Sequence, residues 1–238
     1  MARCYLQVEA VNIEAFVFDT NDISTIRGGS YLLLDAIRAL TREFRTTLHP
    51  VATAASRGLY WFEPRGDDLE QACQAMEQRA LAFLSKQVDG HATFAVAAQT
   101  DVSGDFAQVL VALDTKIRRR QWRTPTVAVP ATAVTSQECY LDGWRPGVTA
   151  FTVDEDAPEA RISQATAFRR KRGHAIKHDL FRELLGVDAK VADWPSAPDL
   201  GTLAQDPAKG NLNGKIAYIH IDGNGFGHLR QTLCQSPD

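Results

Sequence analysis

The residues best suited to chemistry lie near the end of the chain, within residues 215–227. An apolar run leads there to one carboxylate, Asp222, which is followed by Gly223, Asn224, Gly225 and Gly227. A carboxylate at a strand end can hold a divalent cation, and adjacent glycines let phosphate groups approach the backbone. The run therefore predicts a metal position at Asp222 and nucleotide contacts at the four residues named with it. A loop in which Asp222 caps a turn explains the same spacing.

Positive charge is concentrated at two places. Arg169, Arg170, Lys171 and Arg172 lie near the start of a predicted helix, where the helix dipole does not favour them, so they are candidates for contact with nucleic-acid phosphates. A solvated helix surface is the alternative. The second concentration, in residues 116–123, closes a predicted helix, and the dipole accounts for it. His174 and His178 share a helix face but have no third ligand nearby, which argues against a metal.

Composition excludes several classes of protein. The 238 residues are 45% hydrophobic and 23% charged with a net charge of −3, as in ordinary globular proteins and unlike a protein that coats polyanions. The four cysteines show no CxxC spacing, so neither a disulfide framework nor a complete zinc site is indicated. No apolar run approaches the roughly 20 residues that span a bilayer. We expect a cytoplasmic protein without a membrane partner.

The elements that must position these residues begin with an α+β module. Alternating apolar residues predict strands over 5–17, 48–54, 59–63 and 92–98, the first of them either continuous or with an early bend. Helical spacing predicts helices over 31–44, 69–88 and 105–122. We expect Ser30 to cap the first helix and Gly58 to supply a positive φ in the hairpin turn. The order predicts a ferredoxin-like βαββαβ fold with one added helix, closing near residue 125.

Beyond residue 125 the pattern becomes less regular. Prolines punctuate the chain around residues 138–146, a basic helix is predicted over 168–185, and residues 192–213 are typical of a linker. The final strand begins near residue 214. We therefore predict three parts: the ferredoxin-like domain 1–125, a partly irregular, helical connecting region 126–213, and the opening strand of another domain, 214–238.

Several of these blocks together resemble the large polymerase/cyclase subunit of type III CRISPR effector complexes, whose core is two palm domains related to GGDEF nucleotide cyclases. In order along the chain, the blocks are the Phe-x-Phe turn of residues 15–20, the Arg-Gly-Gly-Ser of residues 27–30, the knuckle of residues 139–146 and the Asp-Gly-Asn-Gly of residues 222–225. The resemblance covers most of the chain in outline. It implies a first palm in 1–125, a knuckle-bearing connector and the start of a second palm.

The resemblance also implies chemistry for the complete family member. That protein binds ATP with a divalent metal, Mg or Mn, makes cyclic oligoadenylates, and works with other CRISPR effector subunits and guide or target RNA. The chain departs from the family at two positions. The hairpin that carries carboxylates in an active palm has Arg57 beside Gly58, with only Glu9 available on the first strand, so we expect this palm to lack catalytic residues. In the knuckle, Asp142 replaces a cysteine, which argues against a structural zinc.

Three functional hypotheses follow. In the first, the chain is part of such a large subunit, either a fragment or a truncated product, and is itself inactive. In the second, it is a non-catalytic ferredoxin-like module that binds RNA or another subunit. In the third, it is a GGDEF-related effector domain that binds a nucleotide through a degenerate site.

Overall fold

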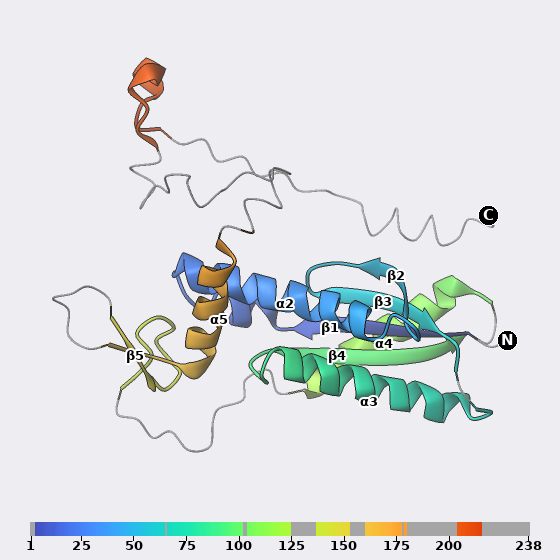
Figure 1. Ribbon diagram of the computed structural model, residues 1–238. Helices are drawn as coiled ribbons and strands as arrows, with labels where there is room; N and C mark the ends of the chain where they lie inside the picture. The colour runs from blue at the N-terminus through green and yellow to red at the C-terminus, as the bar shows by residue number, and fades with distance from the viewer. Residues whose placement is uncertain are drawn as a thin grey trace. The chain divides into compact units, whose positions relative to one another are not determined.

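The computed structural model describes residues 3–64, 66–101, 104–124, 137–152, 160–177, 179 and 204–215 (Figure 1). The chain divides into two compact units, Met1–Lys177 and His178–Asp238. The predicted boundary near residue 125 falls inside the first unit, and the three-part division stays a prediction.

A four-stranded antiparallel sheet forms the centre of the first unit. Its strands are β1 (Arg3–Val11), β2 (His49–Thr53), β3 (Arg57–Phe62) and β4 (Thr93–Asp101), in the order β2-β3-β1-β4. Helix α2 (Ile23–Glu43) connects β1 to β2, and α3 (Leu69–Gln87) connects β3 to β4. This order confirms the predicted α+β class and agrees with the ferredoxin-like arrangement.

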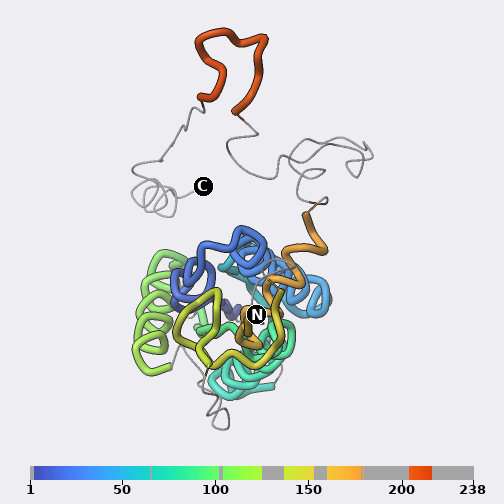
Figure 2. Tube along the Cα trace, turned by 90° about the vertical axis from the view of Figure 1, so that its left-hand side faces the viewer, coloured from blue at the N-terminus to red at the C-terminus, as the bar shows by residue number. Residues whose placement is uncertain are grey.

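Helices cover both faces of the sheet. Alternate residues of β1, such as Leu6 and Val8, pack with α2 and α3 in one core, whereas Tyr5 and Val11 face α4 (Phe106–Arg123) on the other side. Figure 2 shows α4 in green on one side of the sheet and α2 in blue on the other. The first unit is therefore layered helix, sheet, helix around β1 and β4.

Asp68 and Asp105 start α3 and α4 by accepting hydrogen bonds from backbone N–H groups of the first turn, and both helices match their predicted ranges. The first predicted strand is wrong beyond Val11. Asn12 takes a positive φ of 52°, which ends β1, and a short helix, α1 (Ile13–Val17), follows.

Two predicted roles in the turns are also wrong. Helix α2 begins at Ile23 with Asp22 as its cap, so Ser30 lies inside the helix and its hydroxyl donates to the Ile26 carbonyl instead. Gly58 lies in β3 rather than in the turn, and its missing Cβ leaves room for the ring of Tyr60. The glycines mark close packing here.

A small hairpin and one helix complete the first unit. The hairpin pairs β5 (Thr149–Phe151) with β6 (Ala160–Ile162), and α5 (Gln164–Ala175) follows and packs against α2. Helix α5 starts earlier than predicted because the Ser163 hydroxyl accepts the Thr166 N–H and caps it.

In the second unit the described residues contain a 3-10 helix, η2 (Pro207–Leu212), capped by Asp206. None of the described helices is long and apolar enough to cross a membrane.

Candidate functional site at the junction of the sheet and the knuckle segment

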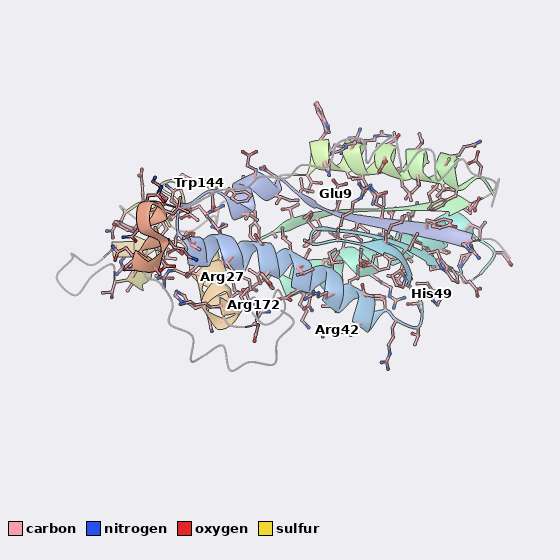
Figure 3. All side chains as sticks on the ribbon, turned by 90° about the horizontal axis from the view of Figure 1, so that it is seen from above. Glu9, Arg27, Arg42, His49, Trp144 and Arg172 are labelled. Atoms are coloured by element: carbon pink, nitrogen blue, oxygen red, sulfur yellow. The ribbon has the colours of Figure 1, made fainter. Side chains whose placement is uncertain are left out.

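The sheet domain meets the knuckle segment and α5 at a junction near the start of α2. The first feature of this junction is a close crossing of α2 and α5. A Cβ on Gly28 would lie 1.8 Å from the Arg169 carbonyl oxygen, and a Cβ on Gly173 would lie 1.8 Å from the Ser24 carbonyl oxygen. The two backbones therefore touch where the glycines face each other. Arg27 donates from Nε to the Gly173 carbonyl at 3.1 Å, and Figure 3 shows Arg27 and Arg172 at this end of α2. The Arg-Gly-Gly-Ser block thus serves helix packing.

Four charged residues meet beside this crossing, and we call Asp19, Asp142, Arg145 and Arg169 the junction cluster. Arg169 holds Asp19 with a two-pronged contact, Nη1–Oδ1 at 2.6 Å and Nη2–Oδ2 at 2.9 Å. Arg145 bonds Asp19 as well and reaches Asp142 at 3.1 Å. The side chains of Arg169 and Asp142 are fully buried and that of Asp19 is 4% exposed. Paired charges of this kind hold their elements in one arrangement, because separating them would leave a charge buried without a partner.

Asp142 organises the knuckle segment, which we define as residues 137–152. One carboxylate oxygen accepts the backbone N–H groups of Trp144 and Arg145, and the other accepts the hydroxyls of Ser163 and Thr166 at 2.9 and 2.8 Å. Burial alone would raise the pKa of Asp142, but these bonds, with the nearby Cys139 thiol, lower that pKa to about 2.

The same bonds decide how well the knuckle segment fits a zinc ion. The Cys139 thiol lies 3.8 Å from the Thr166 hydroxyl and donates to it, and both oxygens of Asp142 are occupied by protein donors. A tetrahedral site needs four free N, S or O ligands. Across the described part of the chain, no group of three or more His, Cys, Asp or Glu residues is placed to hold a metal. The residues present in the knuckle segment do not fit zinc.

A second polar cluster lies under α4, on β1 and β3. Glu9 and Arg57 are direct partners across β1 and β3, a pairing that the sequence did not predict. Arg57 donates to Asp114 of α4 at 2.8 Å, and Gln7 donates to the same oxygen at 2.9 Å. We call Gln7, Arg57 and Asp114 the hairpin cluster. It places the Arg57 guanidinium beside Glu9 and against Asp114, and Figure 3 shows Glu9 between β1 and α4.

The predicted nucleic-acid residues do not share one surface. Arg169 is buried in the junction cluster, Arg172 donates from Nε to Asp35 at 2.9 Å, and Arg170 lies 3.5 Å from Asp22 and over the ring of Phe151. Lys171 is exposed. A phosphate would have to compete with carboxylates for the three arginines, and nucleic-acid contact at these four residues stays a prediction.

The predicted metal and nucleotide positions, Asp222, Gly223, Asn224, Gly225 and Gly227, lie outside the described residues, as does His178. Their roles stay predictions.

The reasoning from sequence missed the roles of Asp19 and Arg145. Both lie in the blocks that carry the resemblance, Asp19 directly after Phe18 in the Phe-x-Phe turn and Arg145 before a proline. A signal was present, because a carboxylate beside buried Phe16 and Val17 needs a cation. Nothing local identified which of the many arginines supplies it.

Comparison with known proteins gave limited matches. No model of a protein family matches the sequence, and no curated protein matches it. Among solved structures, the chain is similar to a chain of a Csm1-Csm4 cassette in complex with pppApA, with a TM-score of 0.42 and 13% identity. For the apo cassette the TM-score is 0.38 with 12% identity, and for the cassette in complex with cA4 it is 0.39 with 14% identity. Each match covers 51% of this chain and 19% of the other.

Proposed function

We propose that this chain belongs to a large subunit of the polymerase/cyclase type from a type III CRISPR effector complex, and that its first palm is structural. In this proposal residues 1–125 are the first palm, residues 126–213 connect it, and residues 214–238 open a second palm. Partners would be the other effector subunits and guide or target RNA. The site for ATP and a divalent metal would involve Asp222, Gly223, Asn224, Gly225 and Gly227.

The observation that carries the proposal is the convergence of blocks that lie far apart in the sequence. Asp19 from the Phe-x-Phe turn, Gly28 from the Arg-Gly-Gly-Ser block and Arg145 from the knuckle segment all meet at α5 or at the junction cluster. These blocks were grouped from the sequence only by their order. A buried, charge-paired contact among them supports one inherited architecture.

The hairpin cluster supports a structural first palm. A palm that clamps two metals on a triphosphate needs at least two carboxylates free to face the metals. Here Arg57 neutralises Asp114, and α4 covers that face of the sheet. We therefore propose that this chain alone makes no oligoadenylate.

Association with effector subunits tests the identity. The chain would be co-expressed with the remaining subunits of the type III complex encoded beside it, and the complex isolated through a tag on a different subunit. We expect the chain to co-purify at a fixed stoichiometry. Failure to associate with any subunit would contradict the large-subunit identity and favour a separate binding module.

Nucleotide chemistry tests the structural role. The purified chain would be incubated with ATP and either Mg²⁺ or Mn²⁺, and the products separated by chromatography and identified by mass. We expect ATP to be recovered unchanged. Oligoadenylate that forms with this chain and disappears in Asp222→Ala, but persists in the matched variant Arg57→Ala, would show that the chain is active.

The alternative, a non-catalytic module that binds another subunit, has its own support. Phe18, Tyr140 and Trp144 near the junction are 62%, 57% and 46% exposed, and exposed aromatic side chains are common in protein interfaces. Co-purification with one subunit, without any effect of ATP, would favour this reading.

A further inference from the structure

Helix α4 presents an unusual outer face. Its inner face buries Val109, Leu113 and Ile117 against the sheet. Arg118 and Trp122, four positions apart, lie one above the other on the opposite side, and Arg119 and Arg123 extend the same surface around the last turns. We call Arg118, Arg119, Trp122 and Arg123 the α4 surface. Trp122 is 90% exposed, the largest value among the exposed large hydrophobic residues of the described chain.

The basic residues of this helix fall into two groups. Arg120 turns inward to Glu77 at 2.6 Å, and the Lys116 ammonium donates to the Ala98 carbonyl at 2.8 Å. The three arginines of the α4 surface differ. Arg118 bonds only the neutral Gln121, and among the described residues no carboxylate pairs with Arg118, Arg119 or Arg123.

The helix dipole explains part of this arrangement. Positive charge in the last turn of a helix is favourable, and Arg120 and Arg123 lie there. The dipole gives no reason for an almost fully exposed indole among three guanidinium groups that no carboxylate of the described residues neutralises. No ring or cation contact is found for Trp122 within the described residues, so intramolecular packing does not explain it either.

We propose that the α4 surface binds single-stranded nucleic acid, with the Trp122 indole stacking on a base and the guanidinium groups of Arg119 and Arg123 contacting phosphates. An exposed ring beside arginines that no described carboxylate neutralises has the two components by which proteins hold single strands without reading sequence. Guanidinium also matches phosphate better than ammonium does, because it donates two parallel hydrogen bonds. This surface lies apart from the junction cluster, and the inference does not depend on the identity proposed above.

Fluorescence anisotropy of the purified full chain with a short fluorescein-labelled oligoadenylate tests the proposal. We expect Trp122→Ala to weaken binding about tenfold, which lies within the range measured when one base loses its aromatic stacking partner. In Arg119→Ala/Arg123→Ala we expect weaker binding. The slope of the logarithm of the binding constant against the logarithm of the salt concentration should become shallower by about 0.7 for each lost phosphate contact. A matched RNA duplex, whose bases are not free to stack, should lose little affinity in Trp122→Ala.

The helix α2 offers a matched control. Arg42 and Arg45 are exposed at its C-terminal end, as Figure 3 shows for Arg42, but no exposed aromatic residue of that helix accompanies them. Arg42→Ala/Arg45→Ala removes the same charge from a surface without an exposed aromatic ring. We therefore expect it to change the affinity for the oligoadenylate less than twofold. Equal losses in both double variants, or no effect of Trp122→Ala, would overturn the proposal. Self-association that requires Trp122, measured by light scattering, would also overturn it by assigning the surface to a second copy of the chain.

Discussion

Asp142 shows how one residue changes the way a loop is held. Its carboxylate accepts two backbone N–H groups and two hydroxyls at the position where the resemblance led us to expect a cysteine. In a zinc site the metal would hold the segments of such a loop together through its ligands. Here the carboxylate of Asp142 holds them together by hydrogen bonds. Arg145 supplies the countercharge, and its guanidinium also lies 4.0 Å from the Trp144 ring centroid. The knuckle segment therefore has a charge-dependent stability.

Substitution of Asp142 by Asn tests this dependence. The pKa of Asp142 falls from 3.8 to about 2 in the folded chain, so ionised Asp142 favours folding above pH 4 and that contribution disappears as the pH falls towards 2. We expect Asp142→Asn to lower the free energy of unfolding by about 2 kcal/mol at neutral pH. The difference from the wild type, measured by urea unfolding, should shrink between pH 4 and pH 2.

Asp89→Asn is the matched control, because the side chain of Asp89 is 71% exposed. We expect it to change stability by less than about 0.5 kcal/mol. If the difference in free energy of unfolding between Asp142→Asn and the wild type stayed constant between pH 4 and pH 2, the stabilisation would come from the hydrogen bonds and not from the charge of Asp142.

At the scale of elements, the crossing of α2 and α5 rests on Gly28. A Cβ added to Gly28 would collide with the Arg169 carbonyl oxygen. A Cβ added to Gly29, one residue later, would have its nearest neighbour at 3.4 Å, an ordinary contact. The two adjacent glycines therefore differ in function. Gly28 permits the close approach, whereas Gly29 mainly lowers helix propensity.

The pair Gly28→Ala and Gly29→Ala separates these effects. In Gly28→Ala the helices must move apart, which we expect to cost about 1–3 kcal/mol or more and to weaken the junction cluster. In Gly29→Ala we expect a change between zero and a gain of about 1 kcal/mol, because alanine favours the helix. Thermal and urea unfolding measure both. Equal stability of the two variants would contradict the close crossing.

Prediction from sequence succeeded where the signal is local. Helices α3 and α4 combine an aspartate cap with apolar residues at helical spacing, and both elements were found with nearly their observed bounds. It failed at the start of α2, because the glycines of the Arg-Gly-Gly-Ser block suggest a loop although tertiary packing requires them inside a helix. The junction cluster joins residues more than a hundred positions apart. No periodicity specifies such a pairing, and only the resemblance grouped its blocks.

At the scale of the first unit, the sheet and α5 depend on each other. Arg169, with no exposed side-chain surface, neutralises Asp19 and bonds the Phe16 carbonyl, and Phe168 packs on the core beneath α2. Removing α5 would expose Gly28 and leave Asp19 without Arg169, and removing the knuckle segment as well would take away its second cation, Arg145. The sheet and helices α1 to α4 are thus covered on one side by residues that follow the predicted boundary at 125.

Two fragments test whether the sheet is complete without that closure. A fragment of residues 1–177 keeps every contact described for the first unit, so we expect its urea midpoint to match that of the corresponding transition in the whole chain. A fragment of residues 1–124 should be less stable by about 3–5 kcal/mol, the cost of stranding a buried charge. In the shorter fragment, Asp19→Asn should recover part of the loss, because it removes the charge that lacks a partner. If the two fragments unfold at the same midpoint, the sheet is an independent domain and the junction cluster holds two domains together without stabilising either.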